Sequence, residues 1–407
     1  MLDWVEDQAK MSKHASIKTD QRTVTSLSEL ALLFLKLGAI AFGGPAVHIA
    51  MMEDEVVRRR KWLSHEEFLD LLGATNLIPG PNSTEMAIHV GYKRRGWAGL
   101  LVAGASFILP AAAIVFVFAW AYVRYGSLPQ TAHALYGVKP VIIAIVLQAL
   151  WHLGRAALKT KVLVVVGVVA VVLNLLRVNE LLVLFLAGVV VVTLRWLIQQ
   201  RSRGNSLRAL VSPAAFVTLA QTAIPTATTI APTVGLWPLF LFFLKVGSVL
   251  FGSGYVLLAF LRADLVERWQ WLTNEQLLDA VAVGQITPGP VFTTATFIGY
   301  LLAGTKGAVV ATVGIFLPAF FFVAISGPLV SRIRRSPTAG AFLDGVSVAS
   351  LALMLVVTYE LGKSALVDFP TVCLAVVSAL LLLRWQVNSV WLVLGGALVG
   401  FMIWSNW

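Results

Sequence analysis

Charged side chains are scarce in this chain, and cysteine is almost absent. Of the 407 residues, 13% are charged and 58% are hydrophobic. Soluble domains carry about 25% charged residues, and a soluble protein of this size could not bury so much apolar surface. The composition excludes a soluble enzyme and a disordered chain. The single cysteine, Cys373, excludes an intramolecular disulfide and a cysteine-based metal site.

Several signatures of other protein classes are also missing. The polar residues 1–26 contain no apolar run long enough for a cleavable signal peptide. No His-Glu-x-x-His or Gly-x-Ser-x-Gly motif is present, and Gly362-Lys363-Ser364 lacks the earlier glycine of a phosphate-binding loop. We therefore predict that the chain is not an enzyme and holds neither a metal nor a cofactor.

The formal net charge of +11 comes from basic residues in short loops, such as Arg58–Lys61 and Lys93–Arg95. Basic loops between apolar runs set membrane topology through the positive-inside rule. We therefore expect no nucleic-acid partner. The basic residues of the tail favour a cytoplasmic N-terminus.

The chain has two sets of apolar segments, so we predict an all-α polytopic membrane protein. A tail (1–26) precedes a first repeat (27–198), a basic connecting region (199–236) and a second repeat (237–407). The expected segments are 27–52, 73–92, 97–123, 138–152, 160–176 and 180–198, then 237–261, 280–302, 305–331, 343–361, 370–384 and 388–406.

The two sets are copies of each other. A shift of 209 positions superimposes Lys36 on Lys245, Trp62-Leu63 on Trp271-Leu272, and Pro79-Gly80-Pro81 on Pro288-Gly289-Pro290. Internal repeats of this size are typical of secondary transporters. The distribution of basic residues favours inverted halves with a crossing at 213–236. As an alternative, a re-entrant hairpin over 27–60 would move Arg58–Lys61 to the inside.

Each repeat contains residues that interrupt its helices. Pro removes an N–H group and Gly relaxes the backbone, so each Pro-Gly-Pro predicts a break followed by a half-helix. The N-terminus of such a half-helix attracts anions. The structural alternative is a simple kink. The segments Phe42-Gly43-Gly44-Pro45 and Phe251-Gly252-Ser253-Gly254 predict a second break in each repeat, with close helix packing as its alternative.

Ionisable residues inside apolar segments are functional candidates by default. Lys36 and Lys245 each lie six residues before a Phe-Gly break, where they would attract an anion or snorkel to a helix end. Glu85 and His89, one helical turn apart, could relay a proton or lock helix packing. We expect Asp70 and Asp279 to be helix-start or loop charges.

These observations define a candidate substrate site where the breaks meet. Its predicted residues are Lys36, Gly43, Gly44, Pro45, His48, Asn76, Pro79, Gly80, Pro81, Asn82, Ser83, Lys245, Gly252, Ser253, Gly254, Gln285, Thr287, Pro288, Gly289, Pro290 and Thr293, with Glu85 and His89 for proton coupling.

The sequence resembles the chromate ion transporter family in its long, two-domain form. The resemblance rests on FGGPAVHIAMMEDEVV (42–57), NLIPGPNSTEMAIHVGYKRRGWAGLLVAGASFILP (76–110), FGSGYVLLAFLRADLVE (251–267) and GQITPGPVFTTATFIGYLLAG (284–304). It implies antiparallel halves in a bacterial inner membrane, and a secondary transporter that exports chromate by alternating access, coupled to the proton motive force. The second repeat departs from the first, with Ser253-Gly254 for Gly44-Pro45.

Some family members are linked to sulfate, so uptake of sulfate or another oxyanion is one alternative. A second is an amino-acid exporter of the lysine exporter type, which shares Pro-Gly-Pro-Asn but is about half this length. A third is a membrane scaffold or lipid scramblase. The expected partners are a small oxyanion and the lipid bilayer, and a homodimer is left open.

Overall fold

The structure, a computed structural model, describes residues 25–42, 44–126, 129–202, 234–250, 256–333, 336–385 and 387–405. Within these ranges every regular element is a helix. Most of the predicted tail and of the predicted connecting region lies outside the described residues.

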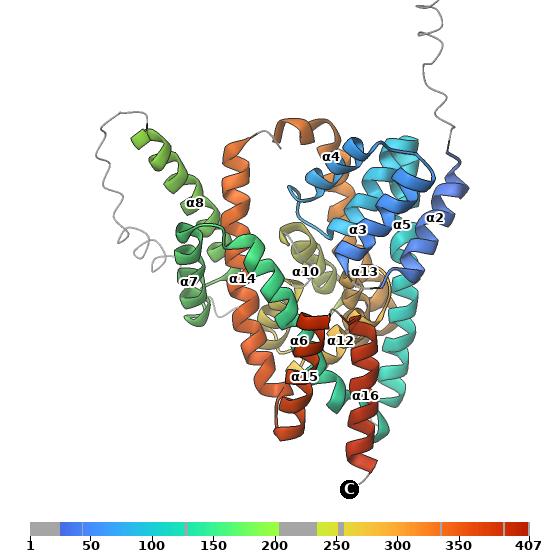
Figure 1. Ribbon diagram of the computed structural model, residues 1–407. Coiled ribbons are helices and arrows are strands. Elements are labelled where there is room, and N and C mark those ends of the chain that lie inside the picture. Colours follow the sequence, from blue (N-terminus) through green and yellow to red (C-terminus); the bar gives the residue numbers. More distant parts are fainter. Residues whose placement is uncertain are drawn as a thin grey trace, which may run out of the picture.

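The two repeats fold into matching series of helices (Figure 1). The first repeat contains α2 (Leu27–Ile40), α3 (Pro45–Glu53), the π-helix η1 (Asp54–Arg59), α4 (His65–Thr75), α5 (Asn82–Tyr125), α6 (Pro129–Ala157), α7 (Lys161–Leu175) and α8 (Glu180–Ser202). The second contains α10 (Leu236–Val249), α11 (Leu257–Leu261), the π-helix η3 (Arg262–Arg268), α12 (Asn274–Ile286), the 3₁₀ turn η4 (Val291–Thr293), α13 (Thr294–Ile333), α14 (Pro337–Ala365), α15 (Phe369–Trp385) and α16 (Ser389–Ser405).

The segment 27–60 is a re-entrant hairpin rather than a crossing. Helix α2 ends at Ile40, and α3 begins at Pro45 after Gly44, whose φ is 83°. The two ends of the segment meet again, because Arg60 Nη1 lies 2.8 Å from Glu29 Oε1. The prediction that 27–52 crosses the membrane is therefore wrong, and the hairpin alternative is confirmed.

A second hairpin follows in the first repeat. Helix α4 runs inward from its Ser64 capping box, and the first arm of α5 returns from Asn82. The end of that arm reaches the same edge as the start of α2, because Arg94 Nε donates to Thr25 Oγ1 over 2.9 Å. Both hairpins thus enter from one edge and turn inside the molecule.

Helix α5 then reverses at Arg95 and Gly96, where the backbone leaves helical angles and Gly96 has a φ of 58°. A Cβ atom on Gly91 would collide with the carbonyl oxygen of Gly99. Residues eight apart in a straight helix would be about 12 Å apart, so the two arms lie against each other. In the second repeat α13 reverses likewise at Ala303 and Gly304.

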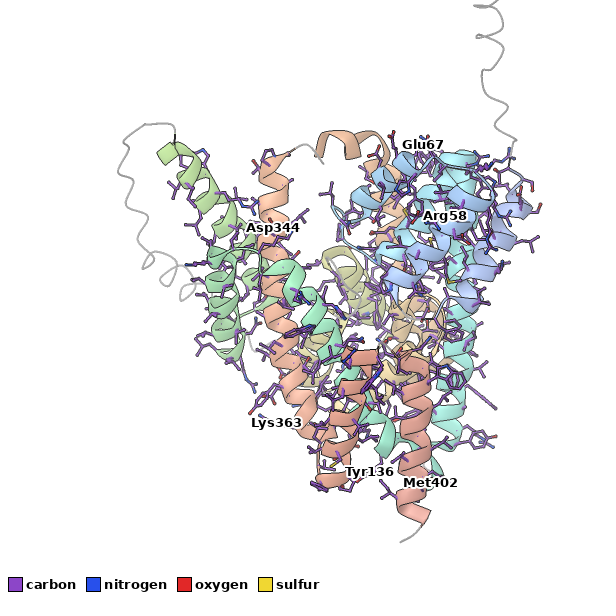
Figure 2. All side chains as sticks on the ribbon, viewed as in Figure 1. Arg58, Glu67, Tyr136, Asp344, Lys363 and Met402 are labelled. Carbon is purple, nitrogen blue, oxygen red and sulfur yellow. The ribbon has the colours of Figure 1, made fainter. Side chains whose placement is uncertain are left out.

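The helices α6 and α14 show that the halves are inverted. These equivalent helices pack on each other. They run antiparallel, because Tyr136 near the start of α6 donates to Asp368, just beyond the end of α14, over 2.6 Å. Figure 2 shows the same relation, with Asp344 high and Lys363 low on α14 and Tyr136 at the lower edge. The predicted inverted repeat is therefore confirmed.

Five helices among the described residues are long and apolar enough to cross a membrane: α5, α6, α8, α13 and α14. The shorter apolar helices α7, α10, α15 and α16 accompany them. The fold is that of a multi-pass membrane protein in which α2–α5 and α10–α13 form one packed group, and α6–α8 pack with α14–α16.

Candidate substrate site

The Pro-Gly-Pro loops of the two halves meet the helix breaks of the opposite halves. The N–H of Gly80 donates to the carbonyl of Leu250 over 2.8 Å, and the N–H of Gly289 donates to the carbonyl of Ala41 over 2.9 Å. Because Gly80 is equivalent to Gly289 and Ala41 to Leu250, the two bonds are one contact repeated about a two-fold axis. Each Pro-Gly-Pro loop therefore lies against the described end of the Phe-Gly break in the opposite half.

Close backbone approach explains the glycines in these loops. Gly80 has a φ of 141° and Gly289 a φ of 90°, which residues with a Cβ atom rarely adopt. A Cβ atom on Gly289 would lie 2.8 Å from Ala111 Cβ and 2.9 Å from the carbonyl oxygen of Gly38. The loop can reach the opposite half only because this position carries no side chain.

The first loop is followed by a half-helix, as predicted. Pro81 is the N-cap residue of α5, and Asn82 is its first residue. Asn82 Nδ2 donates to Asn76 Oδ1 over 2.9 Å and closes the loop. Ser83 is buried behind it. Pro79 completes the turn between α4 and α5.

The second loop has the same course with different polar groups. Pro288 and Pro290 flank Gly289, and η4 precedes α13. The hydroxyl of Thr287 donates to Val283 O over 2.7 Å, and that of Thr293 donates to Pro290 O over 2.8 Å. Gln285 is buried on α12. These hydroxyl groups keep only their oxygen lone pairs for other partners.

His48 lies at the first break. It is buried, its Nε2 lies 3.0 Å from the carbonyl oxygen of Ala41, and its ring packs edge-on against Phe107. Because Ala41 also accepts from Gly289, His48 supports the junction between the halves. Gly44 and Pro45 start α3 at this break. Gly43, Gly252, Ser253 and Gly254 lie outside the described residues.

Each predicted lysine has a carboxylate partner that the sequence analysis missed. Lys36 Nζ lies 3.0 Å from Glu55 Oε1, and Lys245 Nζ lies 2.7 Å from Asp264 Oδ2. Both partners follow their lysine by 19 residues and lie on equivalent π-helices. Only the hairpin fold brings these distant positions together, although the identical spacing in both repeats is a signal that could have found them.

Arginines share these carboxylates. Arg60 Nε lies 3.3 Å from the second oxygen of Glu55, and Arg268 pairs with Asp264. Burial by itself would raise the pKa of Glu55, but hydrogen bonds from Lys36 and Arg60 outweigh burial and lower that pKa below its usual value. In each half the ionised carboxylate therefore keeps the ammonium group of its lysine in a fixed position.

The proton-coupling candidates are buried without partners. Neither carboxylate oxygen of Glu85 has a hydrogen-bond partner among the described residues, and neither has Nε2 of His89. Glu85 Oε1 faces Gly80, since a Cβ atom added to Gly80 would collide with it. The sequence-equivalent residue in the second half, Thr294, donates to Val291 O over 2.8 Å instead.

A groove of about 650 Å³ runs along the first hairpin, from its charged edge toward the first break. Its charged end consists of Lys36, Asp54, Glu55 and Arg59, and its apolar floor of Leu37, Ile40, Ala46, Val47, Ala50 and Met51. Of the predicted site residues that the structure describes, only Lys36 lines it.

Asp279 corrects another expectation. It is buried within α12, where Tyr122 Oη donates to Asp279 Oδ2 over 2.9 Å. It is therefore neither a helix-start nor a loop charge, whereas its counterpart Asp70 is exposed. Glu360, a further carboxylate within an apolar segment, lies 3.1 Å from Lys363 Nζ.

Inverted repeats, broken helices and charged residues at the breaks define a class, the secondary transporters. The model of the chromate transporter family matches residues 28–193 and 237–401. The chain therefore belongs to the chromate transporter family.

Curated relatives agree with this assignment. A chromate transport protein of Cupriavidus metallidurans is 33% identical over 388 residues, which covers 93% of each chain. One of Pseudomonas aeruginosa is 32% identical and covers 94% of this chain and 93% of its own. An uncharacterized transporter of Bacillus subtilis is 32% identical over 130 residues, which cover 32% of this chain and 73% of its own length. No solved structure matches the chain.

Proposed function

We propose that the chain exports chromate from the cytoplasm by alternating access. The observation that supports the proposal is a reciprocal contact, in which each Pro-Gly-Pro loop bonds to the break of the opposite half, Gly80 to Leu250 and Gly289 to Ala41. In this proposal the two half-helix N-termini, each with a partial positive charge, face the anion where the halves meet. Chromate is the substrate that the relatives' names give for those proteins.

The N-terminus faces the cytoplasm in this proposal. Arg58–Lys61 and Lys93–Arg95 lie where the second arms of the two hairpins of the first half return to one edge. Positive charge accumulates on the cytoplasmic side of membrane proteins. The groove along the first hairpin then opens toward the cytoplasm.

The membrane potential supplies most of the driving force. Moving one charge across 100 mV is worth about 2.3 kcal/mol, so a dianion gains roughly 4.6 kcal/mol on leaving a cell with a negative interior. Uptake would have to overcome the same amount by bringing in more than two cations. Few carboxylates besides Glu85 lie within the apolar helices, so we do not expect coupling to several cations. Glu85 and His89 add at most the movement of a proton to the driving force.

The experiment measures efflux of labelled chromate from right-side-out vesicles. Collapsing the potential with valinomycin and potassium should slow efflux several-fold. Vesicles without the protein give the leak rate, and excess sulfate tests whether similar oxyanions compete. Unchanged efflux, together with accumulation driven by an inward proton gradient, would identify an uptake symporter and refute the proposed direction.

A further inference from the structure

Equivalent surfaces of the two halves are open in one half and covered in the other. Val47 in the groove is 39% exposed, whereas its counterpart Val256 is 3% exposed. Leu69 on α4 is 44% exposed, whereas Leu278 on α12 is fully buried. Because the halves share one backbone course, this difference describes how each half sits against the rest of the molecule.

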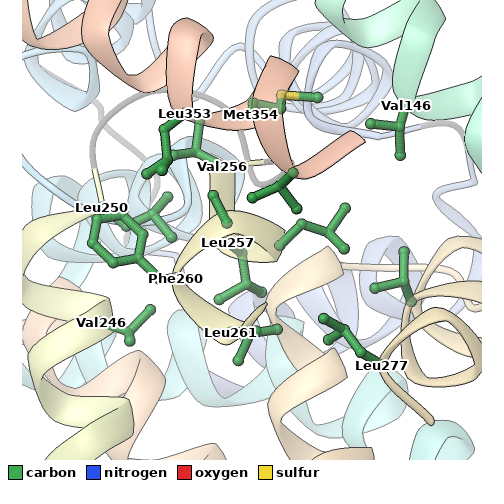
Figure 3. Close-up of a cluster of buried hydrophobic side chains, with 14 of the residues drawn as sticks. Val146, Val246, Leu250, Val256, Leu257, Phe260, Leu261, Leu277, Leu353 and Met354 are labelled. Carbon is green, nitrogen blue, oxygen red and sulfur yellow. The ribbon is translucent and has the colours of Figure 1, made fainter. Parts of the chain in front are cut away.

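The covered surface packs against the other helix group. Figure 3 shows Val256, Leu257 and Phe260 of the second half beside Leu353 and Met354 of α14, and all five belong to one buried cluster. Helix α12 also packs on α6, α14 and α16. Within the described ranges, α4 has extensive contact only with α5.

Polar contacts also hold the covered helix α12 against the other helix group. Asp279 accepts a hydrogen bond from Tyr122 Oη over 2.9 Å, and Lys139 Nζ lies 4.0 Å from its other oxygen. Tyr122 and Lys139 flank the connection from α5 to α6, so this contact ties α12 to the start of the α6 group. With the repeat shift of 208 positions their counterparts are Val330 and Ser347. The first half therefore cannot form the same contact with Asp70.

We infer that the groove along α2 and α3 is the entry route of the anion, and that Asp279, Tyr122 and Lys139 lock the equivalent route of the second half. This inference rests on the proposed function, because it assumes that an anion passes between the two edges. During transport the two surfaces exchange roles: α3 and α4 become covered, and α11 and α12 become open. Because the counterparts of Tyr122 and Lys139 are Val330 and Ser347, we expect the substrate-free protein to rest open at the edge of the first half.

Cysteine labelling tests this gate, meaning the open entry route of the first half and the locked route of the second, without any transport measurement. The single native cysteine is removed as Cys373→Ser, and Val47→Cys and Val256→Cys are made separately as a matched pair. The protein is placed in lipid nanodiscs, where both edges are accessible, and treated with a charged, water-soluble maleimide. We expect Val47→Cys to react and Val256→Cys to be protected at least tenfold.

Tyr122→Phe removes one hydroxyl group and should raise the labelling rate of Val256→Cys several-fold. Asp279→Asn should do the same, whereas Asp70→Asn, its matched control, should not. Size-exclusion profiles identify any variant that fails to fold, and Tyr122→Phe keeps the ring in place. An unchanged Val256→Cys rate in folded Tyr122→Phe would overturn the lock.

Two outcomes separate this inference from the proposed function. If Val47→Cys reacts only with a lipid-soluble maleimide, the groove faces lipid and the entry route is refuted. If the basal labelling pattern is as expected but neither chromate nor sulfate raises Val256→Cys labelling, the gate stands and the proposed oxyanion substrate fails.

Discussion

At the edge where the chain enters and leaves the first hairpin, Arg60 pairs with Glu29 over 2.8 Å and closes the hairpin α2–α3. At the equivalent position of the second half, Trp269 packs against Phe242 with ring centroids 5.3 Å apart. Beside the first Pro-Gly-Pro loop, Glu85 is buried and has no hydrogen-bond partner among the described residues, whereas Thr294 donates to Val291 of the preceding turn η4. The chemistry of the two halves has diverged both at the edge and beside the Pro-Gly-Pro loops.

Other features are the same in both halves. Each has a glycine that contacts its own long helix (Gly38 or Gly247), a glycine that bonds to the opposite half, and a lysine–carboxylate pair 19 residues apart. The two halves thus share their backbone contacts and their lysine–carboxylate pairs, whereas other side chains differ at the edge and beside the Pro-Gly-Pro loops. The shared features are therefore the ones that we expect transport to require in duplicate.

A large effect is expected from Gly38→Ala and Gly247→Ala. The added Cβ atom would collide with the carbonyl oxygen of Phe107 or Ile315. Backbone atoms cannot move aside easily, and overpacking of this kind costs about 1–3 kcal/mol. Both variants should lose at least about tenfold in chromate transport. In the control Gly395→Ala the added Cβ atom has no neighbour within 4 Å, so this variant should transport normally. Normal transport by Gly38→Ala or by Gly247→Ala would contradict the functional equivalence of the two glycines.

Lys36→Ala and Lys245→Ala should each abolish chromate export and leave the protein folded in the membrane. Lys→Arg should retain more activity than Lys→Ala, because positive charge is what the anion requires. The double variant Lys36→Ala/Glu55→Ala sharpens the comparison. If the lysine only neutralised the buried carboxylate, removing both would restore transport, so recovery in the double variant would contradict a role in anion binding.

Much of this architecture could be predicted from the sequence, because its signals are local. Pro-Gly-Pro breaks a helix wherever it occurs, and the repeat shows in aligned tryptophans and lysines. The re-entrant course of 27–60 was only an alternative, because hydropathy cannot distinguish a hairpin from a crossing. Its evidence is a contact between Glu29 and Arg60.

The unpredicted part of the site depends on long-range contacts. Asp279 resembles a helix-start charge in the sequence, and its burial follows from Tyr122, which is 157 positions away. Glu55 and Asp264 become partners of Lys36 and Lys245 only through the hairpin turns. No single-sequence pattern encodes such pairs except their duplication at equal spacing.

A smaller effect is expected from Glu85→Gln, which keeps the shape of the side chain and removes its proton-binding group. The transport rate at neutral pH should change by a few-fold at most, and the pH dependence of chromate efflux should flatten. The counterpart Thr294→Val, which cannot bind a proton either before or after the change, should leave the pH profile unaltered. Complete loss of efflux in Glu85→Gln would show that the proton is essential.

The smallest effect is expected at the edge. Because the ion pair is partly exposed, Arg60→Gln should destabilise the first hairpin by only about 0.5 kcal/mol, and high salt should remove the difference. The destabilisation by Trp269→Leu should not depend on salt, because apolar packing is not screened. Thermal unfolding in detergent at low and high salt measures both. An equal salt response in the two variants would contradict the contrast between the edges.

In the proposed function both halves together build one anion site, and equilibrium binding of chromate to the purified protein counts the sites. One chromate should bind per chain, with binding lost in Lys36→Ala and equally in Lys245→Ala. Two chromate ions per chain, with each variant losing one and keeping the other, would show two independent half-sites and refute the single site.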